Sequence, residues 1–158
     1  MDKLLNLLDK LGIKYQNHEH PPLYTVEDIK KYDINIPRPH CKNLLLKDEK
    51  KNLFLIVTLV DKTINLKIVQ EKIGSKRLSF ASKEILKEVF DLEPGSVTPF
   101  GIMNDKENLV TVVLDKEMMD TDYVNFHPLT NTATITITPN DLQKFLNNYQ
   151  NKKIIITL

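Results

Sequence analysis

The sequence has few of the residues that build disulfide frameworks, metal cages or membrane anchors. Its 158 residues include one cysteine, Cys41, so an internal disulfide and a cysteine-rich zinc site are both excluded. No apolar run approaches the ~20 residues that cross a bilayer. The first 13 residues interleave charged side chains with leucines, unlike the apolar centre of a signal peptide. We therefore expect a cytoplasmic protein, with no membrane partner, that is stabilised by packing.

The chain also lacks a net charge of one sign. Its formal net charge is +1, so the total charge gives no argument for a nucleic-acid partner. The distribution along the chain is uneven: residues 42–87 hold 11 Lys and Arg against 5 Asp and Glu, and residues 88–125 hold 2 against 9. Two interpretations stay open, namely solvated faces that are merely separated in sequence, or a basic surface that meets phosphates.

Several familiar catalytic motifs are missing. Ser96 stands in Gly-Ser-Val-Thr-Pro, which is not a nucleophile elbow, and no phosphate-binding glycine loop is present. His18 and His20 would share one face of an extended segment, but no further ligand lies nearby, so we predict no metal and no cofactor. Cys41 precedes the basic Lys42 and could be a nucleophile of lowered pKa or a small buried apolar group.

Hydrophobic periodicity predicts a single α+β domain (mixed α/β) over residues 1–158, without repeats or linkers. Apolar residues at helical spacing, with capping residues at the ends, predict helices over residues 4–11, 61–73, 82–90 and 138–149, and a short one after Thr25. Runs of β-prone residues predict strands over residues 43–47, 52–60, 109–114, 131–138 and 153–158, the first two as a hairpin.

Polar residues gather where these elements begin or break. Lys42 and Asn43 open a strand after a proline-stiffened loop, from which a lysine can reach a cleft mouth. Phe126-His127-Pro128-Leu129 precedes another strand, and residues 93–101 form a loop with two of the chain's four glycines. Each feature alone suits a solvated side chain or a turn, but together they predict one site.

The same residues carry a resemblance to a known family. The ordered motifs are His20-Pro21-Pro22, Lys42-Asn43-Leu44, Arg77-Leu78-Ser79-Phe80-Ala81-Ser82, Pro94-Gly95-Ser96-Val97-Thr98-Pro99-Phe100-Gly101, Asn104-Asp105 and Phe126-His127-Pro128-Leu129. In this order they resemble the YbaK-type aminoacyl-tRNA deacylases, which are related to the editing domain inserted in bacterial prolyl-tRNA synthetases. The free-standing ProX (PrdX-like) branch is the most similar. The resemblance implies one domain with a mixed, barrel-like β-sheet surrounded by helices.

The resemblance also implies an activity, which is trans-editing: hydrolysis of the ester that joins mischarged alanine to the 3′-terminal adenosine of tRNA(Pro). Prolyl-tRNA synthetase is a further expected partner. The implied catalytic residues are Lys42, at the terminal nucleotide, Gly95, in the family's Gly-x-x-x-Pro element, and His127, as a pocket residue or a general base. The implied substrate-binding residues are Asn43, Ser96, Val97, Thr98, Pro99, Phe100, Gly101, Leu129 and Asn131. The implied tRNA-binding residues are His20, Thr25, Lys47, Lys76 and Arg77.

Elementary chemistry agrees with such a site. An aminoacyl ester is already activated, so a deacylase needs chiefly to position a water and to stabilise the developing oxyanion, which rigid main-chain groups can do. A pocket that admits alanine and rejects proline by size adds the discrimination that a synthetase cannot obtain from ~1–3 kcal/mol of missing contacts. Two alternatives stay open: another small aminoacyl ester such as Cys-tRNA(Pro) as the substrate, or a noncatalytic module that binds tRNA or the synthetase.

Overall fold

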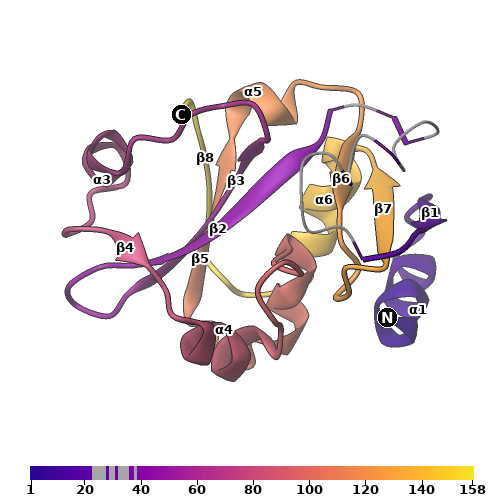
Figure 1. The fold of residues 1–158 in the computed structure, drawn as a ribbon, viewed down its shortest axis with the longest axis horizontal. Coiled ribbons are helices and arrows are strands. Elements are labelled where there is room, and N and C mark those ends of the chain that lie inside the picture. Colours follow the sequence, from indigo (N-terminus) through magenta and orange to yellow (C-terminus); the bar gives the residue numbers. More distant parts are fainter. Residues whose placement is uncertain (23–27, 29–30, 32–35, 38) are drawn as a thin grey trace.

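The chain folds into two β-sheets with helices packed against them (Figure 1). The computed structural model describes residues 1–22, 28, 31, 36–37 and 39–158. Thr25 lies outside these residues, as does most of the short helix predicted after it. The α+β class predicted from the sequence is confirmed.

The larger sheet is mixed, with five strands in the order β4–β2–β3–β5–β8. In chain order the strands are β2 (Cys41–Lys47), β3 (Leu53–Leu59), β4 (Ser79–Phe80), β5 (Val110–Asp115) and β8 (Lys153–Ile156). β2 and β3 form the predicted hairpin, and the carboxylate of Asp48 holds its turn by accepting from the main-chain N–H groups of Lys50 and Asn52. β4 joins β2 antiparallel, whereas β5 and β8 add in parallel.

The smaller sheet is antiparallel, with three strands in the order β1–β7–β6. They are β1 (Gln16–Glu19), β6 (Val124–Phe126) and β7 (Ala133–Ile137). The expectation of one barrel-like sheet was therefore wrong in this respect: the described strands form two separate sheets. β7 is the central strand of this sheet, with the short β1 and β6 on either side. No described strand of the smaller sheet pairs with a strand of the larger one.

The helices begin and end at residues that satisfy their free main-chain groups. They are α1 (Asp2–Lys10), α3 (Leu66–Ile73), α4 (Lys83–Phe90), α5 (Lys116–Met119), α6 (Pro139–Leu146) and the 3₁₀ helix η1 (Pro99–Asn104). Ser82 and Thr138 cap α4 and α6 as predicted, each accepting from a main-chain N–H in the first turn. The helix predicted over residues 61–73 begins only at Leu66, where Asn65 is the cap. Within the residues that the structure describes, no helix has both the length and the apolar character to cross a bilayer.

Apolar side chains form two clusters, one on each face of the larger sheet. The larger cluster joins β2, β3 and β5 to α1, α4, α6 and the smaller sheet, and its fully buried members include Leu8, Leu55, Phe90, Ile135 and Phe145. The smaller cluster contains Leu46, Ile56 and Val113 and is covered by α3 through Val69. Alternation along a strand assigns successive residues of β2 to opposite clusters.

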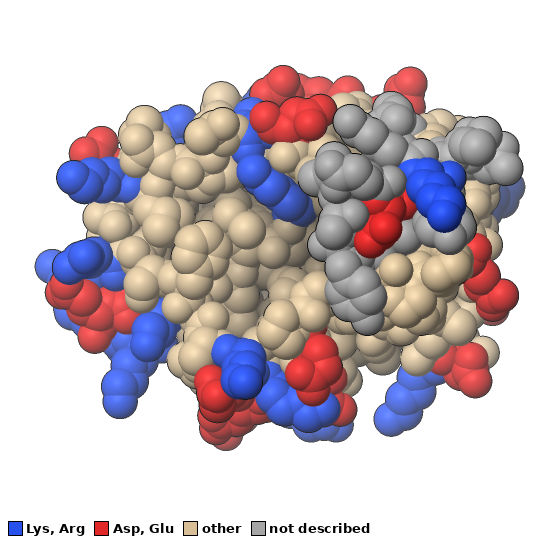
Figure 2. Space-filling model, viewed as in Figure 1, with Lys and Arg blue, Asp and Glu red and all other residues tan. Residues whose placement is uncertain are grey.

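The basic and acidic segments of the sequence partly neutralise one another in the fold. Lys62 Nζ lies 2.8 Å from Asp115 Oδ2 and 2.6 Å from Glu117 Oε2, and Lys87 Nζ lies 2.8 Å from Asp91 Oδ1. On the face shown in Figure 2, charged side chains of both signs lie around the rim and the centre is largely uncharged. This face therefore does not present one continuous basic surface.

Candidate active site

The start of β2 is held against β6. The side-chain nitrogen of Asn125, in β6, donates to the carbonyl oxygens of Pro37 and Pro39, the latter at 2.8 Å. The main-chain N–H of Asn125 donates to the sulfur of Cys41. β2 and β6 are accordingly in contact (Figure 1). The two segments that carry Lys42 and His127 therefore adjoin, although the strands belong to different sheets.

The glycine-proline loop is tied to the same region through η1. Gly95 has φ +94°, a conformation that side-chain-bearing residues rarely adopt, and the N–H of Ser96 donates to Glu93 O at 3.1 Å. The hydroxyl of the fully buried Thr98 accepts from the N–H of Phe100 at 3.3 Å. The ring of Phe100 meets that of Phe126 edge to face, with centroids 6.1 Å apart. The loop thus leads directly into the contact with β6.

The other members of the Gly-Pro element pack the loop onto the hydrophobic core. Pro99, Phe100 and Gly101 are buried, and a Cβ on Gly101 would lie 3.0 Å from Phe90 Cγ. Ser96 is also largely buried, whereas Val97 is half-buried against the larger cluster. Ile102, an apolar residue near the expected pocket, is a core residue.

His127 lies beside His20 at the edge of the smaller sheet. The two ring centroids are 6.2 Å apart, and the planes are inclined by 64°. His127 Nδ1 lies 2.9 Å from Ala133 O, and His20 Nε2 lies 2.8 Å from Thr134 Oγ1. Burial lowers the pKa of His127 and the neighbouring His20 lowers it further, against an opposing effect of the hydrogen bond to Ala133. The imidazole of His127 is therefore neutral at pH 7.

The hydrogen-bond pattern also fixes the tautomer of that neutral ring. A carbonyl oxygen can only accept, so His127 Nδ1 carries the proton that it donates to Ala133 O. Nε2 then has a free lone pair. Leu129 follows with φ +68° and packs on the larger cluster, and Asn131 lies in the turn before β7. The segment from His127 to Asn131 therefore curves back to β7.

Lys42 and Asn43 point to opposite faces of β2. Cys41 and Leu45, which alternate with Lys42, belong to the larger cluster, so Asn43 faces that side, where Val97 and Leu129 also pack. The side-chain oxygen of Asn43 is buried and has no hydrogen-bond partner among the described residues. The amino group of Lys42 donates to the carbonyl oxygen of Lys62. No hydrogen bond joins Lys42 to His127 in the part of the chain that the structure describes.

The basic residues expected at the tRNA lie at the far end of β2. Lys47 ends the strand and pairs with Ser79 of β4, next to Lys76 and Arg77. At about 3.3 Å per residue, Lys47 lies roughly 17 Å along the strand from Lys42. Arg77 lines a cavity with α3, of about 480 Å³. These residues lie at the opposite end of β2 from Lys42, so any tRNA contact there is separate from one at Lys42.

A buried polar network behind Lys42 was not predicted from the sequence. Asp115 is fully buried at the end of β5 and accepts from the hydroxyl of Thr58 at 2.7 Å and from Lys62. Thr58 is the residue directly opposite Lys42 in the hairpin. Burial opposes ionisation of Asp115, but hydrogen bonds from Lys62 and Thr58 outweigh it, and its pKa is lowered. An aspartate that ends a valine-rich strand was the one sequence signal for this network.

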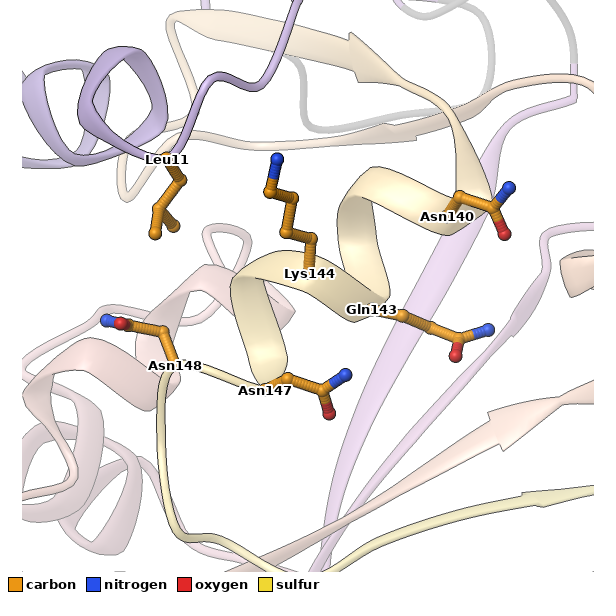
Figure 3. Close-up of a pocket in the computed structure, with 6 residues that line it drawn as sticks. All are labelled: Leu11, Asn140, Gln143, Lys144, Asn147 and Asn148. Carbon is orange, nitrogen blue, oxygen red and sulfur yellow. The ribbon is translucent and has the colours of Figure 1, made fainter.

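Other pockets and candidate ligand groups contribute no predicted site residue. A pocket of about 450 Å³ lies on α6 beside the end of α1, where Lys144 extends toward Leu11 (Figure 3). Another, of about 310 Å³, lies between the residues before β2 and the Lys62–Glu117 pair.

Among the described residues, no group of three or more His, Cys, Asp or Glu side chains could hold a metal ion. Burial raises the pKa of the Cys41 thiol to about 11, which favours the small buried group over the nucleophile.

This arrangement defines an α+β domain in which β2, β6 and the glycine-proline loop adjoin, whereas the side chain of Lys42 lies on the other face of β2. A family model described as the aminoacyl-tRNA editing domain matches residues 20–145. Prolyl-tRNA editing protein ProX of Acetoanaerobium sticklandii is 42% identical over 140 residues, which are 88% of this chain and 85% of that protein. Prolyl-tRNA synthetase associated domain-containing protein 1 of Danio rerio is 34% identical over 157 residues, which are 98% of this chain and 85% of that protein.

Solved structures share the fold at lower identity. Hypothetical protein APE2540 has a TM-score of 0.76 at 17% identity, with 97% of each chain covered. A protein described as a candidate trans-editing enzyme for prolyl-tRNA synthetase has a TM-score of 0.74 at 18% identity, with 99% of this chain and 94% of that chain covered. The chain belongs to the aminoacyl-tRNA editing domain family, which confirms the resemblance seen in its motifs.

Proposed function

We propose that this protein is a trans-editing hydrolase that deacylates mischarged Ala-tRNA(Pro) at the ester of the 3′-terminal adenosine. The observation that carries the proposal is the 42% identity to the prolyl-tRNA editing protein ProX over most of both chains, within a family of aminoacyl-tRNA editing domains. The substrate is then the acceptor end of tRNA(Pro) carrying a small amino acid. Prolyl-tRNA synthetase, named in several relatives, is the proposed partner, and the cytoplasm is the proposed compartment.

We assign the binding of the terminal nucleotide to Lys42. Its ammonium carries three donors, of which one is given to Lys62 O, and the other two have no acceptor among the described residues and can bind a phosphate or a ribose hydroxyl. Asn43 supports the aminoacyl side: its unpartnered oxygen can accept from the substrate where Val97 and Leu129 supply apolar surface. A buried acceptor without a partner is uncommon, and a ligand would satisfy it.

The loop over residues 95–99 supplies main-chain groups for the reacting ester. The N–H group of Val97, a half-buried residue, donates to no residue that the structure describes. The fully buried Thr98 and η1 fix its direction, because the hydroxyl of Thr98 caps η1 and the N–H of Gly101 donates to Thr98 O at 3.0 Å. Donors that are fixed before the reaction stabilise a developing oxyanion without reorganisation. The remaining residues of the Gly-Pro element hold the loop on the core.

His127 is assigned to the pocket wall, where it can hydrogen-bond the attacking water. Its Nε2 lone pair accepts while Nδ1 is held by Ala133 O. The lowered pKa keeps this acceptor unprotonated at pH 7. His20, in contact with that ring, extends the same wall toward the tRNA. Lys47, Lys76 and Arg77 are assigned to phosphates farther along the acceptor stem, as contacts without sequence preference.

The experiment that tests the proposal is a panel of mischarged tRNAs given to the purified protein without added metal. We expect release of alanine from Ala-tRNA(Pro) and no release of proline from Pro-tRNA(Pro), because the larger side chain would clash in a pocket sized for alanine. Faster release of cysteine or serine than of alanine would change the substrate. Salt-dependent tRNA binding with no hydrolysis of any member would leave a binding module and reject the enzyme.

A further inference from the structure

Lys42 is held at its tip by a main-chain group of another segment. Its Nζ donates to the carbonyl oxygen of Lys62, in the loop between β3 and α3. A lysine stem has four freely rotating carbons, so one hydrogen bond orients the ammonium only if the acceptor is itself immobile. The loop turns at this point, because the N–H of Lys62 donates to Leu59 O at 3.1 Å. The rigidity of Lys62 therefore controls where the amino group of Lys42 lies.

The side chain of Lys62 is fixed by three acceptors. Its Nζ lies 2.8 Å from Asp115 Oδ2, 2.6 Å from Glu117 Oε2 and 3.2 Å from the main-chain oxygen of Leu158. The side chain is only 16% exposed. All three ammonium donors are thus occupied, and Lys62 has none left for a phosphate. Although it is a lysine of the basic segment, it does not act by binding tRNA.

Asp115 connects this anchor back to the strand pair that carries Lys42. It is fully buried, and its Oδ2 also accepts from the hydroxyl of Thr58 at 2.7 Å. Its Oδ1 accepts from the N–H of Glu117 at 3.2 Å, so Asp115 is also the N-terminal cap of α5. Thr58 stands opposite Lys42 in the β2–β3 register. The network therefore fixes both the base of the Lys42 stem, through the strand pair, and its tip, through Lys62.

We propose that Lys62 is a positioning residue for Lys42: its ion pair with Asp115 fixes the loop between β3 and α3, and its carbonyl oxygen fixes the position of the Lys42 ammonium. This inference rests on the proposed function for the role of Lys42 in hydrolysis. The structural part, that Lys62 restrains Lys42, is independent of which ester is cleaved. Misplacing a binding group by about 1 Å can cost ~100-fold in rate.

The test measures two properties of Lys62→Met, which keeps most of the length of the side chain and removes its charge. The first is the rate at which Lys42 is acetylated by an N-hydroxysuccinimide acetate ester, followed by peptide mass spectrometry without tRNA. The second is kcat and KM for Ala-tRNA(Pro). We expect acetylation of Lys42 to rise at least about threefold, because its tip is released, and kcat to fall at least about tenfold with a smaller change in KM.

Three further variants complete the test. Lys62→Arg keeps the cation and should return both measurements to within about threefold of the wild type. Lys62→Met with Asp115→Asn removes both charges together, so it keeps the test valid if the single variant leaves Asp115 unpaired and does not fold. Lys87→Met removes another ion-paired lysine, whose partners Asp91 and Glu93 are outside the network of Lys42 and Lys62, and should leave the acetylation rate of Lys42 unchanged.

Two outcomes decide the matter. An unchanged acetylation rate of Lys42 in folded Lys62→Met or in the double variant overturns the inference, whatever the activity of the wild type. A wild-type protein that hydrolyses no ester counts against the proposed function, while the acetylation rates still decide whether Lys62 restrains Lys42.

Discussion

The imidazole rings of His20 and His127 meet edge to face, with their centroids 6.2 Å apart. The residues come from opposite ends of the sequence, and β1 and β7 bring them together: the N–H of His20 donates to Thr132 O at 2.9 Å, and His127 donates to the neighbouring Ala133 O. Two imidazolium ions at this distance would repel, so the pair favours a neutral His127. The protonation of His127 therefore couples the stability of this part of the fold to pH.

His127 should make the free energy of unfolding fall as the solution becomes acidic. Its folded-state pKa is lowered from 6.5, chiefly by burial, so the unfolded chain binds the proton more readily. The contribution of neutral His127 to the free energy of unfolding is fully present above the unfolded-state pKa. It decreases as the pH falls through 6.5 toward the folded-state pKa. Urea unfolding at pH 7 and pH 5 should show a smaller loss for His127→Gln than for the wild type. Equal losses would show that His127 does not contribute.

Gly95→Ala should impair hydrolysis more than stability. Gly95 and Gly74 have φ values of +94° and +70°, and a Cβ on either would meet nothing within 4 Å. Each alanine variant should therefore cost about 1 kcal/mol of unfolding free energy through backbone strain alone. Only Gly95→Ala moves the main-chain donors of the loop, and we expect at least a ~10-fold lower rate of alanine release from it. Equal rates for the two variants would separate the loop from the reaction.

The Cys41 thiol should be unreactive in the folded protein. Its pKa is raised to about 11 by burial, although the N–H of Asn125 opposes the shift. A thiol of that pKa has roughly 100-fold less thiolate at pH 8 than one of pKa 9. Reaction with Ellman's reagent should therefore be slow until urea unfolds the chain, and Cys41→Ala should keep its deacylase activity. Rapid labelling at pH 8 together with an inactive Cys41→Ala would instead support Cys41 as a catalytic nucleophile.

Asn125→Ala should be more damaging than a matched change at Asn104. The buried Asn125 donates to Pro37 O and Pro39 O and accepts from Thr136, whereas the side chain of Asn104 has one hydrogen-bond partner among the described residues, Phe90 O. Unsatisfied buried groups cost ~1–3 kcal/mol each, so thermal unfolding should show a larger loss for Asn125→Ala. Because Asn125 holds the segment that leads into Lys42, its KM for the tRNA should also rise. Equal effects of the two variants would contradict this role.

Local signals in the sequence predicted the elements that depend on neighbouring residues. Ser82 and Thr138 were recognisable as helix caps, and the charged turn around Asp48 marked the hairpin. β4 and β6 were missed, since two and three residues give no period, and every residue of β6 is buried. Their existence depends on pairing with distant strands. The expectation of one barrel-like sheet came from the family resemblance, and the described strands form two sheets instead.

The sequence predicted which residues belong to the candidate site better than it predicted where their side chains point. The sequence indicated Lys42, the glycine-proline loop and His127, and the contact of β2 with β6 brings two of their segments together. It did not indicate that Lys42 turns toward Lys62, since this depends on an ion pair between residues far apart in the chain. The helix predicted from residue 61 starts at Leu66, where Asn65 caps it. The shared pocket itself stays a prediction.

The central claim is that Lys42 takes part in deacylation of Ala-tRNA(Pro), and one paired measurement tests it most directly. Alanine release is followed with the wild type, with Lys42→Ala and with Lys47→Ala, which removes a lysine from the other end of the same strand. We expect Lys42→Ala to lose at least ~100-fold in kcat/KM with its fold intact by circular dichroism, and Lys47→Ala to lose less than about tenfold. Full activity of folded Lys42→Ala would contradict the account.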